Sequence, residues 1–179
     1  MGLEDVFPVS TVHPVMGDDG WVFDGADAEF PTPDRENGKR FLREIYLAAD
    51  PAATGRVTVP VVWDTHNGTI VNNESREIIR DLAIHFTPLA TRESDLYPEK
   101  HRDAIDAAMD AFYEPVNNGV YRCGFAGTQD VLESSVASLF EALDYWNAHL
   151  EKHPYLVGES LTLADIALFA TLVRFDPVY

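Results

Sequence analysis

The sequence predicts an α+β protein in which a small β-containing half precedes an all-helical half. Two short runs rich in valine and isoleucine, residues 57–62 and 69–71, flank the dipeptide Asn67-Gly68. Asn-Gly between two such runs is typical of a β-hairpin turn. From Pro98 onward, apolar residues recur at intervals of three and four, which predicts helices throughout the second half.

Other elements of the first half are placed by composition and spacing. We expect a short strand over residues 6–12, a loop rich in glycine and aspartate over 16–30, and a helix over 39–49. Pro60 lies inside the first hairpin strand, where it cannot donate a hydrogen bond to a ladder, so it should mark an edge, a bulge or a functional kink.

The hairpin leads directly into a helix. Residues 72–75 read Asn-Asn-Glu-Ser, and residues 76–86 have helical spacing. The start of a helix presents free backbone N–H groups and the positive end of the helix dipole, which suit a carboxylate. This stretch therefore predicts a binding site for a small anion.

The second half should contain three longer helices, over residues 101–118, 128–153 and 162–175. Pro115 should kink or locally break the first of them. Thr162 and Asp165 have the spacing of a capping box, so we interpret Asp165 as a structural cap and not as a catalytic acid. A polar, proline-containing linker over residues 87–99 separates the halves.

Composition limits the class of partner and the compartment. The chain has 179 residues and a formal net charge of −17, which argues against nucleic acid and anionic membranes as partners. We find no membrane-spanning apolar run and no signal peptide. A single cysteine, Cys123, fits a reducing compartment, so we expect a cytoplasmic protein. The charge also fits a salt-adapted host, in which case the melting temperature should rise with molar KCl.

Residue spacing gives no metal site and no nucleophile. His149 and His153 are four residues apart with no third ligand in view, and the aspartates of residues 16–30 do not follow the spacing of an EF-hand loop. Cys123 lies within a helical region and not at a helix N-terminus, so we do not expect it to be reactive.

Six stretches together resemble one family. They read HPVMGDDGWVFD, VTVPVVWD, TIVNNES, DLYPE, VNNGVYRCGFA and LTLADIALFATLVRFDPVY. The chain resembles the glutathionyl-hydroquinone reductases, the Xi class of glutathione transferases, over essentially its whole length. The resemblance implies a partial thioredoxin-like, glutathione-binding domain over residues 1–88 and an incomplete transferase C-terminal helical domain over 89–179.

The resemblance also implies a thiol site and its ligand, which is glutathione or a related γ-glutamyl thiol with no metal. The matching positions are Trp21, Arg56, Val57, Thr58, Val59, Glu74 and Ser75. Val59-Pro60 matches the family's cis-prolyl turn, and Glu74 with Ser75 matches the pair that holds the γ-glutamyl group. Judged by residue type alone, a helix cap explains Glu74 and Ser75 equally well, and a solvated loop arginine explains Arg56.

Tyr121 matches the tyrosine that the family places over the electrophile, where its hydroxyl would assist catalysis by hydrogen-bonding or protonating a quinone oxygen. Without the resemblance, a half-buried aromatic residue at a helix kink is an equally good interpretation.

The implied function is reduction of glutathionyl-hydroquinones to hydroquinones with glutathione, by a homodimer whose small-molecule partners are a thiol and an aromatic quinone conjugate. The family's nucleophilic Cys-Pro motif is absent from this sequence. Against the family, the chain begins after the first strand and helix and stops before the last helices, so we expect a fragment with little or no turnover. Two alternatives stay open: a non-catalytic thiol-binding or dimerisation module, and a general glutathione transferase.

Overall fold

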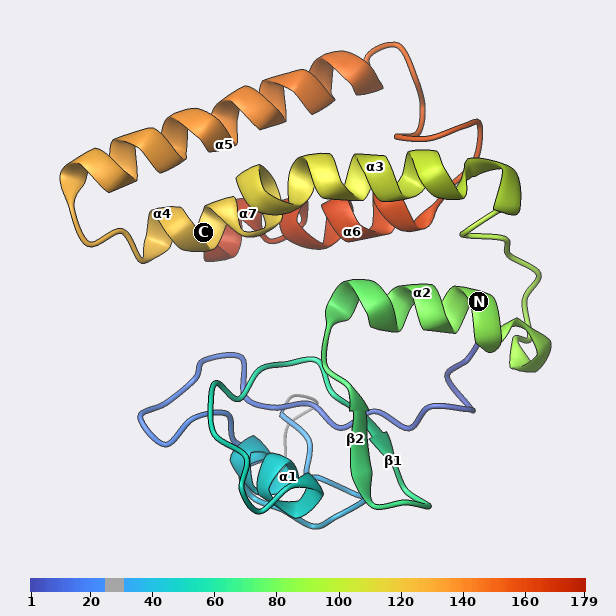
Figure 1. Cartoon of the computed structure of the whole chain (residues 1–179), viewed down its shortest axis with the longest axis vertical. Coiled ribbons are helices and arrows are strands. Elements are labelled where there is room, and N and C mark those ends of the chain that lie inside the picture. The colour runs from blue at the N-terminus through green and yellow to red at the C-terminus, as the bar shows by residue number, and fades with distance from the viewer. Residues whose placement is uncertain (25–30) are drawn as a thin grey trace. The chain divides into compact units, whose positions relative to one another are not determined.

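The computed structural model describes residues 1–24 and 31–179 and divides into two compact units, Met1–Arg92 and Glu93–Tyr179 (Figure 1). Residues 25–30, the end of the loop expected over 16–30, lie outside the described residues. The domain boundary expected after residue 88 stays a prediction.

The first unit contains the expected hairpin turn. Strands β1 (Val62–Asp64) and β2 (Thr69–Asn72) pair antiparallel in a two-stranded sheet. Gly68 has a φ of +63°, a conformation that glycine adopts without steric cost, and its N–H donates to the Asp64 carbonyl at 2.8 Å. Hydrogen bonds from the backbone and side chain of Asn67 hold the pKa of the Asp64 carboxyl below its usual value.

The strand expected over residues 57–62 is largely wrong, because only Val62 belongs to β1. Pro60 has no N–H to give a ladder. Thr58 bonds instead to the side chain of Tyr46, whose hydroxyl donates to the Thr58 carbonyl at 2.9 Å. No strand forms over residues 6–12 either; backbone and hydroxyl bonds between Thr11 and Thr32 hold that segment.

The described residues of the first unit also form two helices and a 3₁₀ turn, η1 (Thr87–Leu89). Helix α1 (Leu42–Ala49) confirms the helix expected over 39–49 with a later start, and the Glu44 carboxylate accepts the Phe41 N–H at 2.8 Å before its first turn. Helix α2 (Ser75–His85) follows the hairpin as expected and buries Ile78.

All regular elements described in the second unit are helices, joined by loops. Its elements are η2 (Glu99–His101), α3 (Arg102–Phe112), η3 (Tyr113–Asn117), α4 (Gly119–Gly124), α5 (Gln129–Leu150), α6 (Leu163–Leu172) and α7 (Phe175–Val178). Helix α3 packs against α6, and α4 packs against α5 (Figure 1). The core is built on Phe112, whose ring meets Trp146 edge-on with centroids 5.8 Å apart. Among the described residues, no helix combines the length and the apolar character needed to cross a membrane.

Pro115 interrupts the helix expected over 101–118. The five residues of η3 form a π-helical turn, in which the Asn118 N–H donates to the Tyr113 carbonyl at 2.8 Å. A proline inside a helix removes one backbone donor and clashes with the preceding turn, and a wider turn accommodates it. The predicted local break of the helix at Pro115 is confirmed.

The start of α6 confirms the structural interpretation of Asp165. One carboxylate oxygen accepts both the N–H and the hydroxyl of Thr162, each at 2.8 Å, and the other oxygen accepts the Leu156 N–H at 2.8 Å. Thr162 is fully buried. Asp165 therefore caps α6 and ties it to the preceding loop.

Candidate functional site

The start of α2 is an open helix N-terminus. Glu74 occupies the N-cap position without a side-chain cap hydrogen bond, and Ser75 is the first helical residue; both side chains are exposed. The first helical bond runs from the Ile78 N–H to the Glu74 carbonyl at 2.9 Å. The N–H groups that precede it lie where an anion can reach them.

A network centred on Tyr46 places the loop of residues 55–61 beside that helix start. The Asn73 side-chain amide donates to the Tyr46 hydroxyl at 3.0 Å and to the Thr58 hydroxyl at 3.2 Å. Tyr46 lies on α1, Thr58 in the loop, and Asn73 directly before Glu74. The network therefore joins residues 57–59 to residues 73–75, and sequence reasoning missed both Tyr46 and Asn73.

Three other residues of the loop, Arg56, Val57 and Val59, are also expected to bind the thiol. Arg56 and Val57 line a hollow of about 220 Å³ together with Tyr46 and Arg43. Arg56 is exposed, whereas Arg43 contacts Asp19 through its carboxylate at 3.8 Å and donates to its carbonyl. Val59 is 44% exposed, and the peptide bond between Val59 and Pro60 is cis.

Trp21 belongs to an earlier loop that pairs with the first residue of α1. It is half-buried, and its carbonyl accepts the Leu42 N–H at 2.9 Å. Within the part of the chain that the structure describes, no hydrogen bond or ring contact joins Trp21 to residues 56–59 or 74–75. The structure thus places Thr58 beside Asn73, the residue before Glu74 and Ser75. Arg56 and Val57 lie with Tyr46 at the neighbouring hollow, and Trp21 lies on another segment of the same unit.

Tyr121 lies in the second unit, on α4, and pairs with a second tyrosine that sequence reasoning missed. The Tyr179 hydroxyl donates to the Tyr121 hydroxyl at 3.0 Å, and the two rings meet edge-on with centroids 5.4 Å apart. Burial and the bond to Tyr121 raise the pKa of Tyr179 to about 12, while the guanidinium of Arg174 opposes the shift.

The direction of this bond matters for chemistry. Because Tyr179 donates to the oxygen of Tyr121, the proton of Tyr121 is left to donate to a ligand. A hydroxyl that accepts one hydrogen bond becomes a better donor in the next. Tyr121 is 45% exposed, so a ligand oxygen can reach it.

We expect the stability of the helical unit to fall as pH rises from about 10 toward 12. The pKa of tyrosine in an unfolded chain is about 10, whereas the pKa of folded Tyr179 is raised to about 12. The stabilisation is therefore complete below the unfolded pKa and is lost as pH rises through the folded pKa. Melting temperatures followed by near-ultraviolet circular dichroism at pH 9, 10 and 11 measure this slope. Tyr121→Phe should flatten it, and an equal slope in both proteins would contradict the pairing.

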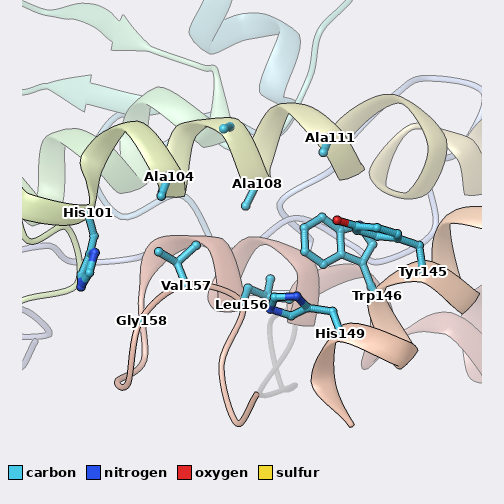
Figure 2. A pocket seen from close by; sticks show the side chains of 11 residues that line it. His101, Ala104, Ala108, Ala111, Tyr145, Trp146, His149, Leu156, Val157 and Gly158 are labelled. Atoms are coloured by element: carbon cyan, nitrogen blue, oxygen red, sulfur yellow. The ribbon is translucent and has the colours of Figure 1, made fainter. Parts of the chain in front are cut away.

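A groove of about 540 Å³ in the second unit lies apart from all of these residues. Figure 2 shows small side chains of α3 on one side, Ala104, Ala108 and Ala111, and Trp146 with His149 of α5 on the other. No candidate site residue lines it. The His149 and His153 rings lie 4.7 Å apart, and no group of three potential metal ligands occurs among the described residues.

Comparison with known proteins identifies the family. The model for the glutathione S-transferase C-terminal domain matches residues 129–179. The chain is 47% identical over 178 residues to a glutathionyl-hydroquinone reductase of Sphingobium chlorophenolicum, covering 99% of this chain and 56% of the relative. The structure of a Xi-class transferase from Natrialba magadii superposes with a TM-score of 0.95 at 50% identity, covering 99% of this chain and 55% of that one.

Two further solved structures contain glutathione. The glutathione-bound structure of the transferase homologue YqjG from Escherichia coli K-12 is 47% identical with a TM-score of 0.93, and the alignment covers 99% of this chain and 57% of that one. The Xi glutathione transferase ECM4 from Saccharomyces cerevisiae, in complex with glutathione, is 32% identical with a TM-score of 0.87, over 99% and 67% of the two chains. The chain spans about half the length of the curated relatives it matches. On these likenesses, which extend over nearly all of its residues, the chain belongs to the Xi class of the glutathione transferase family.

Proposed function

We propose that the protein reduces glutathionyl-hydroquinones to hydroquinones with glutathione, and that this chain supplies the thiol site. In this reaction the aryl–sulfur bond is replaced by an aryl–hydrogen bond, and the released glutathionyl sulfur forms a disulfide with the sulfur of a second glutathione. The relative from Sphingobium chlorophenolicum is named as such a reductase, and two relatives have structures that contain glutathione.

The start of α2 would hold the γ-glutamyl end of the thiol. The Glu74 carboxylate would pair with the ammonium, and the Ser75 hydroxyl with the first backbone N–H groups of α2 would bind the carboxylate. The observation that carries this proposal is the open N-terminus of α2, held beside residues 57–59 by Asn73.

The loop would bind the remainder of the tripeptide. The backbone of Val57 and Val59 offers groups outside any sheet to the cysteinyl unit, while Thr58 would hold the loop in place through its bonds to Tyr46. Exposed Arg56 offers a planar cation to a carboxylate. Trp21 would form a wall of the site. In the second unit, Tyr121 would donate its hydroxyl proton to an oxygen of the hydroquinone.

We also propose that the protein is a cytoplasmic homodimer that needs no metal, as the family resemblance implies. Light scattering on the purified chain tests the assembly. A mass near 20.0 kDa, that of a single chain, would contradict the dimer.

Titration calorimetry on the 179-residue chain tests the proposed function. We expect glutathione to bind and a glutathionyl-hydroquinone to bind more tightly, since its ring oxygen can accept from Tyr121. Tyr121→Phe should weaken binding of the conjugate about fivefold, the contribution of one hydrogen bond of about 1 kcal/mol. S-phenylglutathione, which lacks the oxygen, is the matched ligand and should be unaffected by Tyr121→Phe.

Each failure has a distinct meaning. If glutathione does not bind, the thiol site is refuted. If both aromatic conjugates bind equally well and Tyr121→Phe changes neither, specificity for hydroquinones is refuted, and a general transferase or a thiol-binding module explains the chain better.

A further inference from the structure

Two polar side chains, half-buried Asn117 and buried Thr171, tie the π-helical turn η3 to α6. The Thr171 hydroxyl donates to Asn117 Oδ1 at 3.1 Å, and Asn117 Nδ2 donates to the Ala167 carbonyl at 3.4 Å. Asn117 is the last residue of η3, and Ala167 and Thr171 lie one turn apart on α6. Thr171 is only 4% exposed, so water does not compete well for these bonds.

The surroundings of the pair are apolar. Phe112 and Val116, next to it on α3 and η3, are at most 1% exposed, and Leu168 on α6 is 3% exposed. A satisfied polar pair in such a place defines one arrangement of its elements, because sliding either element leaves buried polar groups unpaired. The pair therefore fixes the register of η3 against α6.

That register decides where Tyr121 faces. Tyr121 follows Asn117 by one helical turn, on α4. A π turn contains one residue more than an α turn, and each α-helical residue advances by roughly 100°. If η3 relaxed to regular helix, Tyr121 would rotate by about that angle and lose its contact with Tyr179.

The second tyrosine depends on the same pair from the other side. Thr171 lies in the last turn of α6, and α7 begins three residues after α6 ends and leads to Tyr179. Arg174, between the helices, donates from its Nε to the Ala170 carbonyl at 2.7 Å. The Asn117–Thr171 contact thus joins the two segments that carry the tyrosines.

We propose that Asn117 and Thr171 are positioning residues that hold Tyr121 against Tyr179. Their importance for catalysis rests on the proposed donation of a proton from Tyr121 to a hydroquinone oxygen. Neither residue would contact the ligand; both would act by holding the tyrosine pair in place.

The test uses the 179-residue chain with isotope-labelled tyrosine rings, followed by nuclear magnetic resonance. The parent protein should show ring-to-ring Overhauser contacts between Tyr121 and Tyr179, since the centroids are 5.4 Å apart. Thr171→Val keeps the side-chain shape and removes the donor. We expect it to abolish those contacts and to lower the pKa of Tyr179 from about 12 toward its ordinary value. Thr171→Ser, which keeps the donor, should retain both signals.

Three controls make the result decisive. Tyr121→Phe removes the hydroxyl partner of Tyr179 and so sets how far the pKa of Tyr179 falls when that bond is lost; burial of Tyr179 and its charged neighbour Arg174 are unchanged. Asn117→Ala breaks the pair from its other partner and should reproduce Thr171→Val. Ile105→Val removes one methyl group from a fully buried position on α3 and should lower the melting temperature without altering either tyrosine signal.

The proposal is overturned if Thr171→Val or Asn117→Ala stays folded and keeps the ring contacts and the titration of Tyr179, because the pair would then only stabilise the core. None of these readouts involves a thiol or a conjugate. Failure here is therefore distinct from failure of glutathione to bind.

Discussion

Replacing Asp165 by alanine should destabilise the helical unit by about 3 kcal/mol, the largest effect on stability that we expect from one substitution in this chain. Its carboxylate accepts three hydrogen bonds, from the Leu156 N–H and from the N–H and hydroxyl of Thr162. Thr162 is fully buried and Leu156 is 5% exposed, so the freed donors would remain without water. Hydrogen bonds to charged groups contribute about 1.5–3 kcal/mol each, and they are not additive.

Urea unfolding followed by circular dichroism measures this change. A domain of this size should lose roughly 4–8 °C of melting temperature per kcal/mol. Asp130→Ala is the matched control, since Asp130 also lies in the first turn of a helix but is exposed; it should cost less than about 1 kcal/mol. Equal losses in the two variants would show that Asp165 is an ordinary helix-end acid.

Replacing Ser75 by alanine should weaken glutathione binding about tenfold, and Glu74→Gln should act in the same direction. A charge-assisted hydrogen bond to the γ-glutamyl carboxylate contributes about 1.5 kcal/mol or more, and tenfold corresponds to about 1.4 kcal/mol. Both side chains are exposed and lie at the N-terminal start of α2, so neither substitution should disturb the core. Calorimetric titration of each variant with glutathione measures the loss.

Two controls separate recognition from general damage. Cysteinylglycine lacks the γ-glutamyl group, so its affinity should be the same for the parent chain and for both variants. Glu133 and Ser134 form another exposed Glu-Ser pair, in the second turn of α5 and inside the helix rather than at its N-cap. The double variant Glu133→Gln with Ser134→Ala should bind glutathione as the parent chain does. If cysteinylglycine is weakened as much as glutathione, the assignment of the γ-glutamyl end is wrong.

The features that sequence predicted well are local. Asn67-Gly68 specifies its own turn, and Thr162 with Asp165 forms a cap from residues three apart, whose spacing is visible in the sequence. Pro115 disrupts a helix because it lacks a backbone N–H and its ring clashes with the preceding turn, whatever the helix packs against. In each case the physical cause lies within a few residues of its effect.

The features that the sequence did not predict depend on partners that are distant along the chain. Residues 57–61 are rich in valine, yet Thr58 bonds to Tyr46, which lies 12 residues earlier. Tyr179 meets Tyr121 across 58 residues, and Thr171 meets Asn117 across 54. Periodicity gives the face on which such a side chain lies but not the element that it meets, so these contacts required the structure.

We propose that the start of α2 and the loop before β1 form one thiol site. A glutathione titration of the ¹⁵N-labelled chain, followed by amide chemical shifts, tests it most directly. We expect saturable shifts concentrated at residues 56–59 and 74–77, with the shifts at 74–77 absent when cysteinylglycine replaces glutathione. Shifts confined to the groove lined by Ala108, Trp146 and His149, or no saturable shift at all, would contradict it.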